Sequence, residues 1–346
     1  MVEREGTGGV ARPLGSGGGV SMLDPAFMDL LCCPACRSGL VQPDESSLRC
    51  TACGESYVVR DGIPRFVPAE NYASNFGLQW NLFRRTQLDS FSGQPISRRR
   101  FLSYTGWTEA ELRGALVLDV GCGAGRFTEV ALSLGARVVA LDYSSAVDAC
   151  RLNHQGAEGL SIVQADIYRL PLKDGVFDRA YCLGVLQHTP DVERAFRALP
   201  PVLKDGGALA VDIYPKLWTD VLWPKYWLRH ATKRMKAERL FATVRTGVRW
   251  LWPVSLAVGR VPLVGRKLRY VIPIVNYEGV YPLSPEQLKD WAVLDTFDML
   301  GPAFDQPQTA ESLERWMRSC GLEGIEVFRS GFLVGRGRKA KAQPQK

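Results

Sequence analysis

The chain lacks the features of membrane-spanning and secreted proteins. No uncharged stretch approaches the ~20 residues that cross a bilayer as a helix, and the run Trp250–Gly259, in its most apolar region, has ten. Residues 1–21 contain charges and many glycines but no apolar core of a signal sequence. Without such a signal, the nine cysteines predict a cytoplasmic protein whose thiols bind metal or pack, rather than form disulfides.

Composition excludes a disordered or fibrous protein, because 46% of the residues are hydrophobic and 23% are charged. The 346 residues predict about two domains, and we find no internal repeat. The net charge of +7 permits an anionic partner without requiring nucleic acid. Changes in composition predict a disordered tail 1–21, a cysteine-bearing unit 22–68, an α/β core 70–215 that begins with helices, a basic insert 216–280, a second part of the core 281–336 and a basic tail 337–346. Met22 is an alternative start.

Two pairs of cysteines form a metal-binding pattern. Cys33 and Cys36 are separated by 13 residues from Cys50 and Cys53, and this spacing fits a tetrahedral zinc site with four cysteine ligands. Gly54 supplies the glycine that such a tight turn favours. Because all four ligands come from the protein, we expect a structural zinc. A unit this short cannot build a large core, so zinc should hold it together, separately from the core of the remaining chain.

The cysteine unit resembles the methyltransferase-activator zinc ribbons. The resemblance covers residues 29–66 and includes the ending Gly62-Ile63-Pro64. It implies a ribbon that binds, or is fused to, a methyltransferase. The extra thiol Cys32 could replace Cys33 in a longer spacing, but the two-residue spacing is favoured.

A strand, a glycine-rich loop and a helix follow one another at residues 115–134. The strand is apolar and ends in Asp119, and Gly121, Gly123 and Gly125 follow it. Glycines permit positive φ and a close approach of ligand to backbone, and a helix N-terminus offers free amides to an anion. This is the layout of a nucleotide-type site at the carboxyl end of a parallel strand.

The spacing of the loop excludes two common nucleotide-binding motifs. Arg126 stands where the dinucleotide fingerprint needs its third glycine, and the Gly-Lys-Ser/Thr of a Walker loop is absent. The motif present is D-x-G-x-G-x-G. The next two strands end in Asp142 and Asp166, and two further strands, at 177–184 and 208–213, follow in order. This series of motifs resembles the class I S-adenosylmethionine (SAM) dependent methyltransferases.

That resemblance implies a Rossmann-like, seven-stranded α/β sheet with a helical insert after strand five, and SAM as cofactor. Asp142 would accept both ribose hydroxyls. Asp166 would meet the adenine amino group, and Ile167 would pack on the ring. The expected cofactor-binding residues are Asp119, Gly121, Cys122, Gly123, Gly125, Asp142, Tyr143, Asp166, Ile167 and Leu183.

Methyl transfer to a hydroxyl needs a general base, and the chain has three histidines. His188 follows the fourth strand on the ligand side and is the candidate base or substrate-orienting residue, with a purely structural role as the alternative. His154 is predicted to be a surface residue, and His230 lies in the basic insert. The segment before His188 lacks the D/N-P-P-Y signature of many N-methylating enzymes, which favours small molecules, sugars or lipids as acceptors. Weaker candidates are Tyr181, Tyr214 and Asp212.

The insert sets the sign of the protein's charge. Residues 216–270 contain 13 Lys/Arg and two acids, a net charge of +11 that leaves −4 for the remaining chain. Interleaved tryptophans fit an interfacial or anionic-substrate surface, or nucleic acid; the alternative is a solvated lid whose tryptophans pack on the core. Insertions after strand five commonly build the acceptor pocket in this fold. The five tryptophans are Trp218, Trp223, Trp227, Trp250 and Trp252.

Residues 28–336 together resemble a bacterial group of zinc-ribbon-bearing SAM methyltransferases, on the segments WNLFRRTQLDS, GVLQHTPD and VLDTFDMLGP…FDQPQT. We expect methylation, on oxygen or carbon, of a small or lipid-linked anionic acceptor such as a sugar, glycan or specialised metabolite. The alternatives are an rRNA or tRNA methyltransferase and a non-enzymatic scaffold that retains SAM. Nucleic acid is less favoured, because the chain outside the insert is acidic. The expected location is the cytoplasm, with residues 216–270 as a candidate peripheral contact to the inner membrane face.

Overall fold

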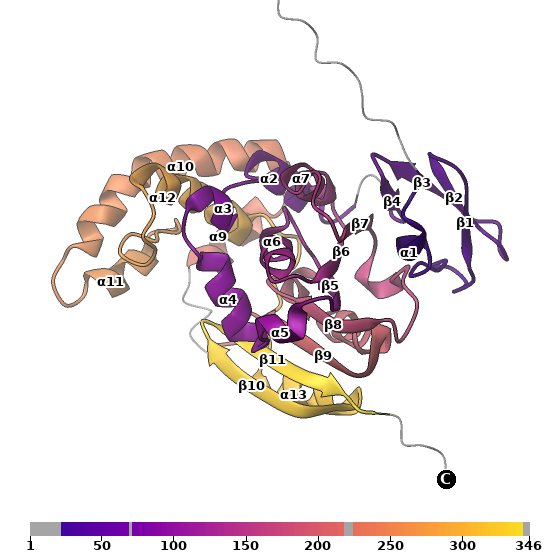
Figure 1. Ribbon diagram of the computed structural model, residues 1–346. Coiled ribbons are helices and arrows are strands. Elements are labelled where there is room, and N and C mark those ends of the chain that lie inside the picture. The colour runs from indigo at the N-terminus through magenta and orange to yellow at the C-terminus, as the bar shows by residue number, and fades with distance from the viewer. Residues whose placement is uncertain (1–21, 69–70, 218–223, 342–346) are drawn as a thin grey trace, which may run out of the picture.

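A sheet of 11 strands runs through the part of the chain that the computed structural model describes, residues 22–68, 71–217 and 224–341. Its order is β1-β2-β3-β4-β7-β6-β5-β8-β9-β11-β10. Figure 1 shows β1 to β4 at one end of the molecule, β5 to β9 at its centre and the hairpin of β10 and β11 at its lower edge. The predicted seven-stranded α/β core is confirmed, and the sheet is larger than predicted because the cysteine unit extends it.

The cysteine unit folds as a small antiparallel ribbon. Its short strands alternate exposed and buried residues, as expected where one face packs on a core. The elements are α1 (Pro25–Met28), β1 (Leu40–Asp44), β2 (Ser47–Cys50), β3 (Ser56–Arg60) and β4 (Ile63–Arg65).

The core strands are mostly buried runs of apolar residues, as parallel strands covered on both faces require. Strands β5 to β9 pair in parallel, so their carboxyl ends meet at one edge, whereas the hairpin β10–β11 pairs antiparallel with β9. The predicted tail from 337 therefore begins inside β11. The strands are β5 (Leu116–Val120), β6 (Arg137–Asp142), β7 (Leu160–Gln164), β8 (Phe177–Cys182), β9 (Leu203–Ile213), β10 (Leu322–Ser330) and β11 (Phe332–Lys339).

Helices cover both faces of the core sheet and confirm the helical region predicted before it (Figure 1). In α13, Leu313, Trp316 and Met317 lie on one buried face at the spacing of an amphipathic helix. These elements are α2 (Ser74–Leu82), α3 (Asp89–Ser92), α4 (Ile96–Thr105), α5 (Glu109–Leu112), α6 (Arg126–Ser133), α7 (Ala146–Asn153), η1 (Ile167–Arg169), η2 (Leu186–His188), α8 (Val192–Arg197), η3 (Pro200–Val202) and α13 (Ala310–Ser319).

The insert forms a separate helical layer with its own apolar core. Leu240, Val244, Val248 and Trp252 recur every four residues along one face of α10 and pack with α12. The segment containing α12, which the sequence assigns to the methyltransferase core, therefore contributes a helix to this layer. The layer consists of α9 (Pro224–Thr232), α10 (Ala237–Gly259), α11 (Gly265–Leu268), η5 (Arg269–Val271) and α12 (Pro285–Leu300).

The tryptophans of the insert divide between its core and its surface. Trp252 is buried, whereas Trp250 and Trp227 are exposed, so the lid interpretation holds for only part of the segment. Trp218 and Trp223 lie outside the described residues. Among the described helices, none is long and apolar enough to cross a bilayer.

The ribbon and the parallel sheet share one apolar core, so the prediction of two separate cores is wrong. Phe27, Leu31 and Leu48 of the ribbon belong to the same buried cluster as Leu118 and Val163 of the central strands. The physical reason is that β4 pairs in parallel with β7, which joins the ribbon to the edge of the sheet, so residues of both pack in one layer.

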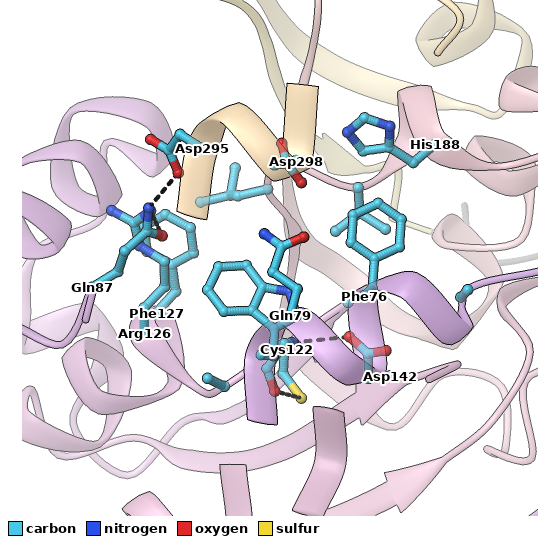
Figure 2. Close-up of a pocket in the computed structure, with 18 of the residues that line it drawn as sticks. Phe76, Gln79, Gln87, Cys122, Arg126, Phe127, Asp142, His188, Asp295 and Asp298 are labelled. Atoms are coloured by element: carbon cyan, nitrogen blue, oxygen red, sulfur yellow. Dashed lines mark hydrogen bonds between the residues drawn. The ribbon is translucent and has the colours of Figure 1, made fainter. Parts of the chain in front are cut away.

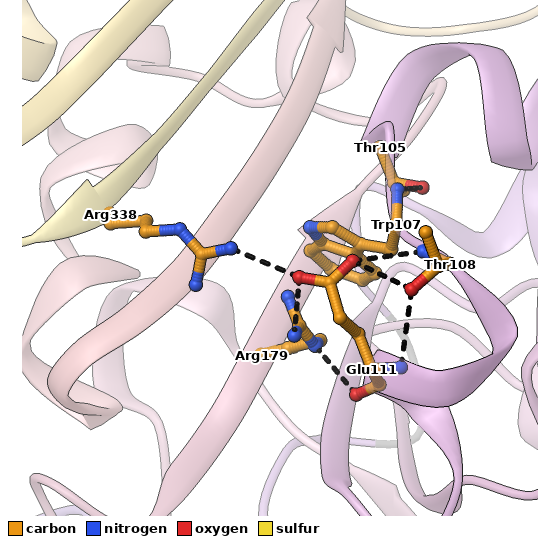
Figure 3. Close-up of polar contacts among 6 residues, drawn as sticks. All are labelled: Thr105, Trp107, Thr108, Glu111, Arg179 and Arg338. Carbon is orange, nitrogen blue, oxygen red and sulfur yellow. Dashed lines mark hydrogen bonds and ion pairs between the residues drawn. The ribbon is translucent and has the colours of Figure 1, made fainter.

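The Glu111 carboxylate ties α5 to two strands far apart in sequence (Figure 3). It accepts from the backbone N–H of Thr108 at 3.0 Å in a capping box, and from the guanidinium groups of Arg179 and Arg338, each at 3.0 Å. The N–H and the hydroxyl of Thr108 and, after them, the two arginines lower the pKa of Glu111 to about 2. The carboxylate therefore stabilises the folded state most when it is charged.

Glu111→Gln should lower the free energy of unfolding by about 1 kcal/mol at neutral pH, because the amide loses two ion pairs at a partly exposed site. A depressed folded-state pKa contributes stability above the unfolded value, 4.5, and loses it as pH falls toward about 2. The free energies of unfolding of wild type and Glu111→Gln, measured with urea, should therefore converge as the pH falls over that range. The control is Glu109→Gln, which removes an exposed i,i+4 ion pair with Arg113 and should hardly change the free energy of unfolding. An equal loss of stability in both variants would contradict the prediction.

Candidate functional site

The four predicted metal ligands lie together at the end of the ribbon. The Sγ atoms of Cys33, Cys36, Cys50 and Cys53 are all within 4.8 Å of one another, and two pairs are 3.7 and 3.4 Å apart. Tetrahedral Zn–S bonds of ~2.3 Å place sulfur atoms about 3.8 Å apart. The donor set and its spacing therefore fit a structural zinc held by these four thiolates.

The backbone of each cysteine turn also fits such a site. The residue after each second cysteine has positive φ: 76° at Gly54, as predicted, and 66° at Arg37. The N–H of Ala52 lies 3.5 Å from Cys50 Sγ, directed at a thiolate position. Cys32 lies outside the cluster, and its N–H donates to Pro171 O instead.

The ribbon forms hydrogen bonds to the loops at the carboxyl edge of the sheet. Arg37 donates to Leu170 O and Leu172 O, in the connection between β7 and β8. Arg65 donates to Gln164 at 2.8 Å and to Asp148 of α7 at 2.6 Å. Gln164 in turn donates to Tyr143 O at 3.1 Å. The ribbon thus fixes the loops after β6 and β7.

A cavity of about 370 Å³ opens at this carboxyl edge. The glycine loop and Asp142 form one side, and Asp295, Asp298 and His188 form the other, with Phe76 of α2 between them (Figure 2). The cavity brings together residues from all parts of the chain after the ribbon. Of the predicted cofactor-binding residues, those that line it are Gly121, Cys122, Gly123, Asp142, Tyr143, Ile167 and Leu183.

The glycine loop approaches its neighbours too closely for a side chain. Gly121 has φ of 78°, and a Cβ there would lie 2.2 Å from a methyl group of Val185. Trp80 of α2 packs over the loop, 3.1 Å from the corresponding position at Gly123. The loop therefore needs glycine both for its conformation and for its contacts.

Asp142 holds the loop while facing the cavity. Its Oδ2 accepts from Gly123 N at 2.9 Å, and its Oδ1 accepts from the N–H and the hydroxyl of Ser144 at 2.8 and 2.7 Å. A carboxylate has about four acceptor positions, so these three bonds leave one open toward the cavity for a ribose hydroxyl. Contact with both ribose hydroxyls stays a prediction. Burial raises the pKa of Asp142, and the bonds from Ser144 oppose that rise.

Three predicted cofactor residues do not line the cavity. Asp119 is buried and accepts from Thr128 Oγ1 at 2.6 Å, and burial raises its pKa to about 7. Asp166 caps η1 through the N–H of Tyr168 at 2.9 Å. Gly125 begins α6, and its carbonyl lies 3.0 Å from His154 Nε2. These residues support the loops that do line it.

The prediction that His154 is a surface residue is consequently wrong. Its ring is half-buried against the glycine loop, because α7 packs beside the start of α6. The sequence pattern could not show this contact between two successive helices.

His188 lines the cavity and has a defined orientation. Its Nδ1 lies 3.0 Å from Phe304 O, and a carbonyl only accepts, so Nδ1 carries the proton of the neutral ring. Nε2 is then the acceptor nitrogen. The ring packs between Phe76 and Tyr214, with centroids 5.3 and 5.5 Å away.

The weaker catalytic candidates differ in position. Asp212 is buried and already accepts from Gly184 N and Arg100, which leaves it unsuited to act as a base. Tyr181 is buried beneath the site, whereas Tyr214 lines the cavity. His230 is exposed, and its Nδ1 lies 2.8 Å from Tyr226 O.

The sequence pattern missed two carboxylates in the cavity wall. Asp295 and Asp298 lie three residues apart on α12, a spacing that puts both on one helix face. Asp295 accepts from Tyr277 OH at 2.5 Å and from Gln87 at 3.0 Å, and Gln87 accepts from Arg126 (Figure 2). Burial raises the pKa of Asp295 to about 6, and burial also raises that of Asp298, where His188 opposes the rise.

The charge inside the cavity differs from that of the insert. From residues 216–270 the described lining includes Lys225 alone, which pairs with Asp305 at 3.4 Å. Val275 and Tyr277, within the predicted insert 216–280, also line the cavity, so among the described residues the insert contributes these three positions to it. Residues 275–299 contribute more of the wall, including Tyr277 and Trp291.

Two family models match separate segments of the chain. Residues 118–211 match the family described as methyltransferase domain, and residues 24–62 match the Trm112p-like protein family. The chain contains a methyltransferase domain behind a Trm112p-like ribbon. The matched segment of the methyltransferase domain begins in β5 and ends in β9, so it includes the glycine loop, Asp142 and His188.

Curated relatives match the methyltransferase domain over part of their length. A ubiquinone biosynthesis O-methyltransferase of Xanthomonas euvesicatoria is 37% identical over 105 residues, 30% of this chain and 44% of that protein. A malonyl-[acyl-carrier protein] O-methyltransferase of Pseudescherichia vulneris is 35% identical over 155 residues, 42% of this chain and 60% of that protein. The human N-acetylserotonin methyltransferase structure is similar with a TM-score of 0.44 and 16% identity, over 80% of this chain and 61% of that one.

The purified protein should hold one zinc ion per chain, and Cys36→Ser with Cys50→Ser should lose it. Because the ribbon shares its core with the sheet, zinc loss should also destabilise the methyltransferase domain. Metal analysis and urea unfolding test both effects. Cys320→Ser, outside the cluster, is the control. Full zinc content in the double variant, or an unchanged unfolding midpoint of the domain, would contradict this prediction.

Proposed function

We propose that the protein is a SAM-dependent methyltransferase that methylates a hydroxyl of a small or lipid-linked acceptor. The observation that carries the proposal is the juxtaposition, in one cavity, of the glycine loop with Asp142 and of His188 with an acceptor nitrogen directed away from its Phe304 bond. Two curated relatives of the methyltransferase domain are O-methyltransferases by name. C-methylation stays the alternative chemistry.

The cofactor supplies an electrophilic methyl group on a sulfonium sulfur. Asp142 has one free acceptor position for a ribose hydroxyl, and Tyr143 and Ile167 line the adjoining wall. Arg126 makes no ion pair within the described ranges; it donates to Ser97 and Gln87 only. Its guanidinium lines the cavity at the start of α6, where it could pair with the carboxylate of the cofactor.

His188 is proposed as the general base. Its Nε2 would take the hydroxyl proton of the acceptor while the acceptor oxygen bonds to the methyl carbon and the carbon–sulfur bond breaks, with S-adenosylhomocysteine as the leaving group. The imidazolium would then release its proton to water. The Phe304 carbonyl fixes the tautomer, and Asp298 lines the same cavity. Phe76 and Tyr214 hold the ring in place.

The lining of the cavity favours a small polar acceptor over RNA. Asp142, Asp295, Asp298 and Asp305 line the cavity beside Arg100, Arg126 and Lys225, so its lining is not the basic surface that a polyanion needs. Aromatic walls with a few polar groups are typical of small-ligand sites. The Gln79 amide lines the cavity beside Asp298, with which it interacts, and it could bond an acceptor hydroxyl. An anionic head group, as first expected, would lie outside the cavity, toward the basic insert.

Asp142→Asn should weaken S-adenosylhomocysteine binding about 10- to 100-fold, because a hydrogen bond to a charged acceptor contributes ~1.5–3 kcal/mol. Titration calorimetry measures the affinity. The matched control is Glu158→Gln, an exposed carboxylate outside the cavity lining, which should bind like wild type. Equal affinities in both variants would remove Asp142 from the site.

His188→Asn should reduce kcat by about 100-fold or more while leaving S-adenosylhomocysteine affinity near wild type, because a general base acts on the acceptor proton alone. Transfer of labelled methyl from SAM to a panel of hydroxylated small and lipid-linked acceptors identifies the substrate first. Methylation of rRNA or tRNA with none of these acceptors would favour the RNA alternative. Binding of SAM without transfer to either class would favour the scaffold.

A further inference from the structure

An exposed apolar surface lies at the far end of the insert. On the outer face of α10, Trp250 and Val254 lie one helical turn apart and are exposed, and apolar residues continue through the following turn and α11. Eleven of the 17 exposed large hydrophobic side chains in the described chain lie between residues 227 and 280. We call the distal patch the group Trp250, Val254, Val261, Leu263, Val264 and Leu268.

The turn between α10 and α11 presents its leucine to solvent. Leu263 is 102% exposed and has φ of 67°, a left-handed conformation that a leucine rarely adopts. The N–H groups of Val264 and Gly265 donate to Pro262 O and Val261 O at 2.8 and 2.9 Å, which holds the turn in shape. Packing within the protein does not explain a leucine here, so its exposure is consistent with an external partner.

Basic side chains surround the distal patch. Residues 239–277 contain seven Lys/Arg and no acid. Arg245 and Arg249 are exposed beside Trp250, and Arg260 and Lys267 flank the turn. A second copy of the same patch would oppose like charges across a symmetric interface. The complementary partner is an anionic surface that also accepts aliphatic side chains.

We propose that the distal patch docks on an anionic lipid bilayer. Leu263 and Val264 would enter the boundary between head groups and acyl chains, while Arg249, Arg260 and Lys267 contact lipid phosphates. Such a helix lies on the membrane rather than across it. Figure 1 shows α11 at the opposite end of the molecule from the ribbon, so the tip can reach a surface without the ribbon obstructing it.

A short stretch of chain connects the distal patch to the wall of the cavity. The chain passes from η5 directly to Val275 and Tyr277, which line the cavity beneath α10 and α12. Docking would favour lipid-linked acceptors over free small molecules. This statement about the acceptor rests on the proposed function. Docking itself needs neither the cofactor nor methyl transfer, so the docking proposal and the proposed function can fail independently.

Co-sedimentation with phosphatidylcholine vesicles, with and without phosphatidylglycerol, tests the docking. The full chain should bind the anionic vesicles, and binding should weaken with salt. Leu263→Asp should reduce partitioning about tenfold or more. Arg249→Gln, Arg260→Gln and Lys267→Gln combined should reduce it on the order of 100-fold. The matched control is Leu152→Asp, on an exposed site of α7.

Calorimetry with S-adenosylhomocysteine shows that each variant is folded and keeps its cofactor site. Failure of wild type to bind anionic vesicles, or equal binding by Leu263→Asp and Leu152→Asp, would overturn the proposal. So would a concentration-dependent dimer that Leu263→Asp abolishes and vesicles do not displace, since that result assigns the distal patch to a second copy of the chain.

Discussion

The junction between ribbon and sheet, centred on Arg65, is the constraint on which the candidate site depends. The Arg65 guanidinium is almost wholly buried, and its bonds to Gln164 and Asp148 join β4 to β7 and α7. A buried charge is tolerated only with such partners, and loss of one leaves the other uncompensated. Gln164 in turn donates a hydrogen bond to the carbonyl of Tyr143, which lines the cavity. A zinc-held ribbon thus positions loops that no zinc ligand touches.

The cavity is assembled from surfaces that serve different purposes. The parallel sheet supplies a rigid edge, where Asp142 and the glycine loop meet. Helix α2, from the chain before the sheet, covers that edge with Phe76, Gln79 and Trp80. This division suits methyl transfer, in which the protein mainly holds the reacting atoms in line.

Charge is separated between the inside of the site and its outer surface. Inside, Asp295 and Asp298 face a cavity to which residues 216–270 contribute Lys225. Outside, arginines and a lysine surround exposed aliphatic residues at the tip of the insert. The cavity lining mixes acids with Arg100, Arg126 and Lys225, whereas residues 239–277 carry basic side chains and no acid. This arrangement fits an acceptor whose reacting hydroxyl enters the cavity while an anionic head group or membrane remains outside.

The sequence by itself determined the local chemistry. The cysteine spacing identified the four metal ligands, and the run from Asp119 to Gly125 identified the loop that needs glycine, because both patterns are set by short-range geometry. Only the tertiary structure decided which acids face the cavity. Asp119 and Asp142 each end a strand, yet Asp119 turns to Thr128 while Asp142 turns to the cavity. Asp295 and Asp298 reach the site because α12 packs against the insert and α2, a long-range contact that residue spacing does not encode.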